Sequence, residues 1–354
     1  MISVPIPIAN SHGYESIPRN KDLKIAVPYS CNYPSRVAII DWKGECFVCI
    51  CEIWLPISVG NIDNFDRLDQ IWSSDVARLL QKDIMQDRVF THCAVDRCGI
   101  LDEDKIEPRY QVSINIDESC NLKCPSCRKD SIMITDGPDY ELKLKRAHHI
   151  VNLLENFDQD CRIIMCGNGD PLASAIMRPL IQTWRPKKNH TIRLFTNGLL
   201  LEKQLEGNPI LESIHEFMIS IDAGSKEVYE RVRLGGLWSQ LIRNFDWLKA
   251  NLKYPRRQTN IQFVLQKENF EDLVNFCELM IKYDFSATVT YLENWATWDN
   301  FQEHDVIGNI NHADHPRAMR VLSQAIDRYH GDQIKFGSKL LQVTGHTPTA
   351  RSSI

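Results

Sequence analysis

Between Tyr110 and Leu292 the chain alternates short apolar segments with longer stretches of helical hydrophobic spacing. The expected strands are 110–116, 162–165, 191–196, 217–221, 261–265 and 288–292, and the longer expected helices are 142–157, 173–184, 238–252 and 270–283. Such alternation predicts a parallel sheet with helices outside it. Six units are fewer than the eight that close a full barrel. We therefore expect an α/β fold, a partial (β/α)6 TIM-like barrel, with its chemistry at the carboxyl ends of the strands.

The residues before Tyr110 show a different sequence pattern. A hairpin turning at Gly44 is expected first, then two short helices, and an acidic run that ends at Pro108 indicates a linker. The expected parts are an N-terminal arm at 1–24, a small cysteine-rich α+β domain at 25–108, the partial barrel at 109–293, and a C-terminal extension at 294–354 with a helix that begins near His315.

Twelve cysteines are unusual in a chain of 354 residues whose 43% apolar and 25% charged residues are ordinary for a globular protein. The net charge of −5 gives no chain-wide basic footprint, so no nucleic acid partner is expected. No apolar run reaches the roughly 18 residues of a membrane span. The apolar start, 1–8, lacks a basic leader and is broken by prolines, unlike a signal peptide. We therefore expect a cytoplasmic protein whose clustered cysteines serve metal binding or catalysis.

Three of these cysteines, Cys120, Cys124 and Cys127, follow the first expected strand of the alternation, where a site should lie. Zinc would normally need a fourth protein ligand in a structural site. An iron–sulfur cube held by three cysteines leaves one iron free to bind a substrate or cofactor. The cube is the favoured interpretation, and a zinc knuckle completed by a distant cysteine is the alternative.

The C-x-x-x-C-x-x-C spacing after the first strand of a partial barrel resembles the radical S-adenosylmethionine (SAM) superfamily. The resemblance implies a [4Fe–4S] cluster on Cys120, Cys124 and Cys127 whose open iron binds SAM. It further implies a 5′-deoxyadenosyl radical that abstracts hydrogen from a substrate, and an electron donor such as flavodoxin or ferredoxin. One departure is Ser126, where the family often has an aromatic residue that contacts adenine.

The same resemblance implies cofactor-binding residues at the ends of later strands. They are Gly167, Asn168, Gly169, Asp170, Asn197, Ser220, Asp222 and Arg233. The turn at 166–171 is similar to the Gly-Gly-Glu-Pro turn of the family, with Asn168 and Asp170 as departures. Arg233 is preferred to Arg231 as the arginine that faces the cofactor, and a solvated helix face is the alternative for both.

The spacing of Cys31, Gly44 and Cys49 resembles the first half of the pattern in SPASM and twitch domains, which bind auxiliary clusters. Cys93 and Cys98 would close a four-thiolate site. The resemblance thus implies one auxiliary [4Fe–4S] cluster on Cys31, Cys49, Cys93 and Cys98, in a domain that here precedes the barrel instead of following it. A four-cysteine zinc site is the alternative.

The other cysteines are Cys46, Cys51, Cys161, Cys166 and Cys277. Strand alternation places Cys51 on the side of Cys49, which it can replace as a ligand, and places Cys46 on the opposite side. The remaining three have no convergent partner and are expected to be small core residues.

Similar enzymes with an auxiliary cluster most often modify peptides by crosslinking, epimerisation or side-chain oxidation, and this is the expected function. A radical dehydrogenase or rearrangement enzyme acting on a small molecule is the second interpretation. A zinc-stabilised binding module without catalysis is the third. The short arm before Ile25 shows no leader-peptide-binding domain, which counts against a peptide substrate.

Overall fold

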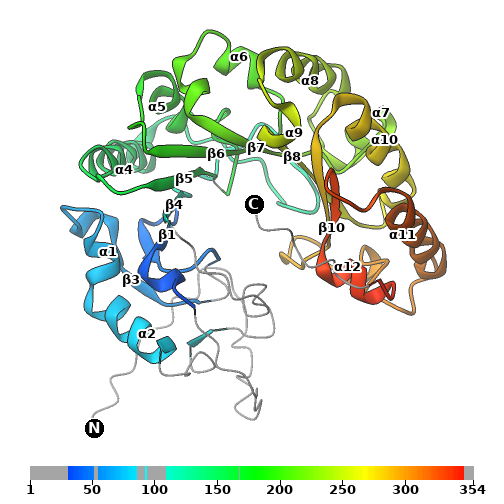
Figure 1. Cartoon of the computed structure of the whole chain (residues 1–354), viewed down its shortest axis with the longest axis horizontal. Helices are drawn as coiled ribbons and strands as arrows, with labels where there is room; N and C mark the ends of the chain where they lie inside the picture. Colours follow the sequence, from blue (N-terminus) through cyan, green and yellow to red (C-terminus); the bar gives the residue numbers. More distant parts are fainter. Residues whose placement is uncertain (1–30, 52–54, 86–91, 94–108, 167, 347–354) are drawn as a thin grey trace. The chain divides into compact units, whose positions relative to one another are not determined.

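The computed structural model of the chain describes residues 31–51, 55–85, 92–93, 109–166 and 168–346. The chain divides into two compact units. The first unit comprises Met1–Glu118, Ile134–Gly169 and Ala175–Ile192, and the second comprises Ser119–Met133, Asp170–Ser174 and Arg193–Ile354. Figure 1 shows the strands and helices of both units.

In the first unit the described strands follow the order β3-β2-β1-β4-β5. Their bounds are β1 Val37–Ile40, β2 Glu45–Phe47, β3 Ser58–Asn61, β4 Tyr110–Ile114 and β5 Cys161–Met165. β1 pairs antiparallel with β2 and parallel with β4, which pairs parallel with β5. The structure confirms the hairpin expected at Gly44, where φ is +83° and favours glycine. The sequence did not predict β3 or the pairing of β1 with β4.

The helices of the first unit cover an aromatic core. They are η1 Tyr33–Ser35, η2 Ile62–Asn64, α1 Gln70–Ser73, α2 Asp75–Met85, α4 Gly137–Glu155 and α5 Met177–Thr183. Trp72 of α1 packs against Tyr110 and Phe157, with ring centroids 4.8 and 6.0 Å away. Its indole N–H also donates to the carbonyl of Val37, 3.0 Å away, so α1 is fixed to β1 by both packing and a hydrogen bond.

The second unit contains the strand order β6-β7-β8-β9-β10, and β7, β8, β9 and β10 pair in parallel. Their bounds are β6 His190–Thr196, which begins in the range of the first unit, β7 Ile214–Ser220, β8 Thr259–Leu265, β9 Ser286–Tyr291 and β10 Ile334–Phe336. Along β8 buried and half-buried residues alternate over the whole strand. One face of this strand is therefore packed in the core and the other is partly open.

The helices of the second unit follow its strands in chain order. They are α6 Leu201–Leu205, η3 Pro209–Ser213, α7 Lys226–Val232, α8 Trp238–Asn251, α9 Pro255–Gln258, η4 Phe270–Asp272, α10 Leu273–Tyr283, η5 Phe301–Glu303, α11 His315–Tyr329 and α12 Ser338–Val343. Helices α8, α10 and α11 lie on the outer side of the strands (Figure 1). The helix expected near His315 is confirmed as α11, which has Pro316 in its first turn.

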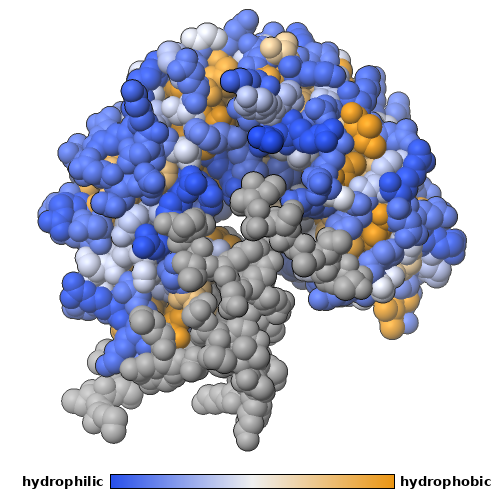
Figure 2. Space-filling view, in the orientation of Figure 1, coloured by the Kyte–Doolittle hydropathy of each residue, from blue (hydrophilic) through white to orange (hydrophobic). Residues whose placement is uncertain are grey.

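These units confirm the predicted α/β class, with a cysteine-rich region ahead of the parallel strands. The predicted domain bounds stay predictions, and the arm at 1–24 lies outside the described residues. Among the described helices none is long and apolar enough to cross a membrane. Figure 2 shows hydrophilic residues over most of the described surface in view, with hydrophobic residues in smaller patches.

Candidate active site

The three cysteines of the predicted cluster lie on one loop of the second unit, residues 119–133. The backbone N–H of Cys120 donates to the carbonyl of Ile132 (3.0 Å) and closes the loop. A tight turn follows Cys124, whose carbonyl accepts from the N–H of Cys127 (2.9 Å). The Cys124 side chain is buried, with 5% exposed, whereas Cys120 is half-buried and Cys127 is exposed. The three thiols of the loop therefore differ in solvent exposure, from buried to exposed.

Nitrogen donors point at the sulfurs of this loop. The Sγ of Cys120 accepts from the backbone N–H of Leu122 at 3.4 Å and from Nδ2 of Asn197 at 3.9 Å. The Sγ of Cys124 accepts from the guanidinium of Arg233 at 3.6 Å. N–H donors of this kind stabilise negative charge on sulfur and tune a cluster that the sulfurs hold.

Arg128 lies within electrostatic reach of all three thiols. Burial opposes the charge of its guanidinium, but Cys127, Cys120 and Cys124 outweigh that penalty and raise the pKa of Arg128. Burial also raises the pKa of Cys120, to about 11. Binding a cluster therefore requires Cys120 to lose a proton that burial favours.

In the described part of the chain, no three His, Cys, Asp or Glu side chains converge closely enough to hold a single metal ion. An iron–sulfur cube makes a different demand, because each cysteine binds a different iron. Three thiols on one loop, with N–H donors aimed at sulfur, can supply such ligands. The three cysteines can therefore provide one sulfur to each of three irons.

Asp170 organises the support behind Cys120. One of its carboxylate oxygens accepts from the N–H of Asn197 (2.7 Å) and the hydroxyl of Thr196 (2.9 Å), and the other accepts from the N–H of Leu172 (2.9 Å). Burial raises the pKa of Asp170, and these donors act in the opposite direction. Asn197 is thereby held in place, and its Nδ2 also donates to Oδ1 of Asn121 (2.8 Å).

Asp222 and Arg233 form a buried ion pair behind Cys124, with 2.6 Å between Oδ2 and the guanidinium. The other oxygen of Asp222 accepts from the N–H of Val264 (2.8 Å) and its carbonyl accepts from Asn269 (3.0 Å). Burial penalises the charge of Arg233, but Asp222 and Cys124 outweigh it and raise the arginine pKa. The guanidinium is therefore held charged against the sulfur of Cys124.

Tyr229 is a residue of this group that the sequence interpretation did not single out. It is fully buried, and its hydroxyl has no hydrogen-bond partner within the described residues. Burial raises its pKa, while Arg233 acts against the rise. The helical spacing of Tyr229 and Arg233, four residues apart on α7 and its cap, was the available signal, since residues so spaced share a helix face.

A half-buried polar face runs along β7, β8 and β9. In the strand register Ser220 lies opposite Gln262, which lies opposite Thr288. The Oδ1 of Asn260 accepts from the side chains of Gln262 (2.8 Å) and Thr288 (2.9 Å). The predicted cofactor residue Ser220 thus lies on a hydrogen-bonding surface.

Other predicted cofactor residues lie elsewhere or outside the description. Asn168 and Gly169 belong to the range of the first unit, and Gly167 lies outside the described residues. Arg231, the alternative to Arg233, donates to the backbone carbonyl of Glu268 (2.7 Å). The preference for Arg233 agrees with its position beside Cys124, and its contact with the cofactor stays a prediction.

The predicted auxiliary cysteines belong to the first unit. Cys31 packs against the small buried cluster of Tyr33 and Val37, and Cys49 is buried just beyond β2. Cys93 is half-buried, and Cys98 lies outside the described residues. The four-thiolate site therefore stays a prediction.

Cys46 lies in β2, where its thiol donates to the carbonyl of Gly44 (3.8 Å). Burial raises its pKa well above the ordinary range, which suits a structural thiol. Cys51 is half-buried. Of the two alternatives to Cys49, Cys51 therefore has the more accessible sulfur.

Two families match the chain. Residues 114–280 match the Radical SAM superfamily, and residues 31–99 match SPASM, an iron–sulfur cluster-binding domain. The second match confirms that the auxiliary domain precedes the barrel in the chain. Together the matches confirm the expected cofactors, [4Fe–4S] clusters and SAM.

Curated relatives cover part of the chain. A probable GTP 3′,8-cyclase of Methanococcus maripaludis (strain C5) is 28% identical over 126 residues, 35% of this chain and 40% of the cyclase. The mycofactocin maturase MftC of Mycobacterium ulcerans (strain Agy99) is 22% identical over 174 residues, 49% of this chain and 45% of the maturase. The chain thus spans less than half the length of each of these relatives.

Solved structures also align in part. Streptococcus suis SuiB bound to S-adenosylmethionine has a TM-score of 0.40 and 13% identity, over 66% of this chain and 52% of SuiB. The structure of anSMEcpe with bound AdoMet and the Cp18Cys peptide has a TM-score of 0.41 and 18% identity, over 64% of this chain and 62% of that one. Likenesses of this size establish no shared substrate.

Proposed function

We propose, from the radical SAM domain and the SPASM iron–sulfur cluster-binding domain that this chain carries, that the protein cleaves SAM reductively and modifies a peptide by radical chemistry. The observation that carries the proposal is the loop of Cys120, Cys124 and Cys127, with Asn197 and Arg233 donating to its sulfurs. These cysteines would hold the [4Fe–4S] cluster. With SAM, such a cluster supplies a 5′-deoxyadenosyl radical that takes a hydrogen atom from the substrate.

The surrounding residues orient and insulate this site. Arg233, fixed by Asp222, keeps a positive charge against the sulfur of Cys124. Asn197, fixed by Asp170, directs a neutral amide N–H at the sulfur of Cys120. Ser220 lies on the polar strand face, where its hydroxyl is available to the ribose of SAM. We assign the turn of Gly167, Asn168 and Gly169 to the same cofactor, as the family resemblance implies.

Two features support a peptide as the substrate. The SPASM match covers the region of Cys31, Cys49, Cys93 and Cys98, which we propose to hold one auxiliary [4Fe–4S] cluster that accepts an electron from the substrate radical. One curated relative is named a maturase, mycofactocin maturase MftC. An electron donor such as flavodoxin or ferredoxin would deliver the electron that begins each turnover.

A small-molecule substrate is the second candidate, and a specific observation favours it. The relatives of Methanococcus maripaludis are named GTP 3′,8-cyclases, and this match has the higher sequence identity, 28% against 22% for the maturase. A nucleotide substrate would make the protein a rearrangement enzyme that acts on a small molecule.

Deuterium transfer separates the two candidates. The reconstituted protein is incubated anaerobically with SAM, a reductant and either a pool of synthetic peptides with perdeuterated residues or ribose-deuterated GTP. We expect deuterium in 5′-deoxyadenosine with the peptide pool, because the radical takes its hydrogen from the substrate. Label from GTP alone would replace the peptide proposal with the nucleotide one, and the absence of 5′-deoxyadenosine in every incubation would contradict both.

Metal analysis tests the cluster assignment separately. We expect roughly eight irons per chain after anaerobic reconstitution, which corresponds to two cubes. The Cys98→Ala variant should lose only the iron of the auxiliary cluster and should still cleave SAM. Zinc at both sites without iron would favour the zinc-stabilised binding module.

A further inference from the structure

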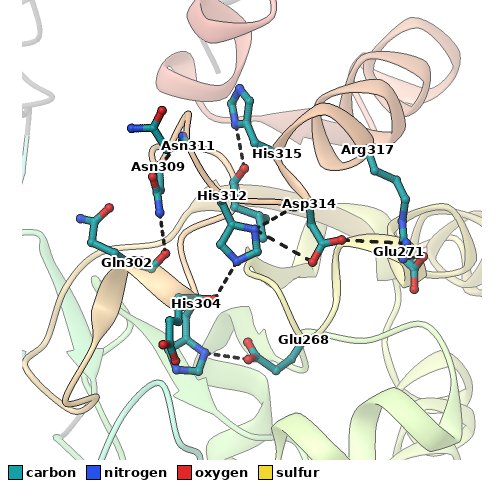
Figure 3. Close-up of polar contacts among 12 residues, drawn as sticks. Glu268, Glu271, Gln302, His304, Asn309, Asn311, His312, Asp314, His315 and Arg317 are labelled. Atoms are coloured by element: carbon teal, nitrogen blue, oxygen red, sulfur yellow. Dashed lines mark hydrogen bonds and ion pairs between the residues drawn. The ribbon is translucent and has the colours of Figure 1, made fainter.

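A histidine and a carboxylate are paired beyond the carboxyl ends of β8 and β9. The Nδ1 of His304 lies 2.7 Å from Oε1 of Glu268, as Figure 3 shows. Trp298 stacks on the imidazole, with ring centroids 4.2 Å apart and planes inclined by 12°. Glu268 follows β8, while His304 and Trp298 lie in the segment that follows β9. The imidazole is therefore oriented by one charged and one aromatic neighbour from two different segments.

The backbone fixes the same histidine. The carbonyl of His304 accepts from the N–H of Lys267 (3.0 Å), and its N–H donates to the carbonyl of Phe301 (3.0 Å). The Oε2 of Glu268 is buried and forms no hydrogen bond within the described residues. Among the described residues, the carboxylate of Glu268 therefore hydrogen-bonds to His304 alone.

The pair leaves one imidazole nitrogen available. A carboxylate only accepts hydrogen bonds, so Nδ1 of His304 must carry the proton shared with Glu268. In the neutral imidazole Nε2 then has a lone pair, and Nε2 forms no hydrogen bond in the described part of the chain. The side chain is 22% exposed. An oriented imidazole with one nitrogen held by a carboxylate and the other unengaged is the arrangement of a general base.

Two contacts connect this pair to the cluster loop. Asn269, the neighbour of Glu268, donates to the carbonyl of Asp222 (3.0 Å), which belongs to the ion pair behind Cys124. On the other side Lys129 of the cysteine loop pairs with Asp299 (3.0 Å), one residue beyond Trp298. The His304 segment therefore borders the cluster loop at the carboxyl end of the sheet, where parallel α/β folds carry out their chemistry.

A cavity of about 290 Å³ borders Glu268, the carboxylate of the pair, and His304 is not among its lining residues. It is lined by Val228, Arg231, Lys267, Glu268, Glu271 and Asp272. Glu271 is paired with Arg317, and one oxygen of Asp272 accepts from two backbone N–H groups. The ammonium of Lys267 has no ion-pair partner in the described part of the chain and can meet a carbonyl or carboxylate of a ligand.

We propose that His304 is the proton acceptor for the substrate, that Glu268 is its positioning residue, and that the cavity beside them holds part of the peptide. This inference rests on the proposed function. In the step, the substrate first loses a hydrogen atom to the 5′-deoxyadenosyl radical. It then loses a proton to Nε2 of His304 and one electron to an oxidised iron–sulfur cluster. The product is therefore two hydrogens lighter than the substrate, and the histidine becomes an imidazolium beside Glu268.

The first test needs no substrate. Oxidised, cluster-loaded protein is labelled with ¹⁵N-histidine, and the His304 resonances are assigned by their loss in a His304→Asn variant. At about pH 8.5, well above the ordinary pKa of histidine, we expect the Nδ1–H tautomer with an unprotonated Nε2. A proton on Nε2 would overturn the proposal, because that nitrogen could accept no proton from a substrate.

The second test separates hydrogen abstraction from proton removal. Asn at position 304 keeps a donor near the place of Nδ1 and removes Nε2, so the contact with Glu268 is retained. With the deuterated peptide pool, His304→Asn should still transfer deuterium to 5′-deoxyadenosine but yield the dehydrogenated product about 100-fold more slowly. Glu268→Gln should slow the product less and shift the tautomer of His304 towards Nε2–H.

A matched histidine controls for general effects. His346 also pairs with a carboxylate, because its Nε2 lies 3.0 Å from Oδ1 of Asp327. Both residues are far from the cluster loop in the sequence. The His346→Gln variant keeps a donor near Nε2 and should match the unsubstituted protein in both measurements. If His304→Asn instead lost deuterium transfer and product formation to the same extent, His304 would have only a structural role, and the proposal would be wrong. Failure of the proposed function itself is distinguishable, because it removes deuterium transfer from the unsubstituted protein and leaves the tautomer unchanged.

Discussion

At the scale of single residues, the site depends on a charge buried next to a thiol. Arg233 and Cys124 are 109 residues apart in the chain, and the structure brings them to 3.6 Å. The family resemblance nominated both, but the contact between them depends on tertiary packing. Likewise, alternation along a strand would put Ser220 and Asp222 on the same side, whereas β7 ends at Ser220 and Asp222 has a left-handed φ of +54°. Alternation therefore does not extend to Asp222, and its ion pair with Arg233 was not predictable from it.

Removing the carboxylate of Asp222 should destabilise the second unit. The Asp222→Asn change leaves the buried guanidinium of Arg233 without its partner, and such uncompensated charges cost about 3–5 kcal/mol. Asp284→Asn is the matched control, because its pair with Arg256 is exposed and such pairs contribute about 0–1 kcal/mol. Urea unfolding followed by hydrogen exchange in β7 and β8 measures both. Equal losses in the two variants would show that the buried pair is not special.

At the scale of elements, long segments of strong periodicity were predictable and short ones were not. The helix α8 and the strand β8 match the expected ranges to within a few residues. The strands β3 and β10 have four and three residues, too few to show a period, and they form because neighbouring strands offer free edges. The pairing of Glu268 with His304 joins two segments without periodic pattern, so the sequence offered no signal for it.

The hairpin between β1 and β2 offers a test of conformation against packing. Gly44 has φ +83°, and a Cβ there would lie 2.8 Å from Cζ of Arg146, whose guanidinium pairs with Asp63 (2.6 Å). Gly137 has a nearly equal φ of +84° with open space around its Cβ position. Gly137→Ala should therefore cost only the conformational strain, about 1 kcal/mol, and Gly44→Ala clearly more. Equal unfolding free energies for the two variants would contradict the packing role.

The start of β6 should be sensitive to acid. Burial lowers the pKa of His190, whose Nε2 lies 3.0 Å from the carbonyl of Phe157. The unfolded chain then binds a proton more readily than the folded one, so stability falls as pH drops through the ordinary histidine range near about 6.5. His190→Gln keeps a donor near Nε2 and removes the titration. Protection factors of β6 amides, obtained from hydrogen exchange between about pH 5 and 7.5 after correction for the intrinsic exchange rate, should fall with acid in the unsubstituted protein and lose this dependence in the variant. An unchanged pH profile would assign the sensitivity to another group.

At the scale of the whole molecule, the cysteines that the structure describes divide by environment. Cys161 and Cys277 are buried, and burial raises the pKa of each to about 12, as expected for core thiols. The cysteines of the 119–133 loop differ, because donors are arranged around their sulfurs. The arrangement along the chain, with the SPASM region before the radical SAM region, was predictable because the cysteine spacings resemble those of the two families.

The central claim is that the loop of Cys120, Cys124 and Cys127 supports reductive cleavage of SAM. The most direct measurement is 5′-deoxyadenosine formation by anaerobically reconstituted, reduced protein, with Cys124→Ala and Cys277→Ala compared side by side. Both changes replace a buried thiol, but only Cys124 is a proposed ligand. We predict that Cys277→Ala forms 5′-deoxyadenosine like the unsubstituted protein and that Cys124→Ala forms none. Undiminished 5′-deoxyadenosine from Cys124→Ala would contradict the account.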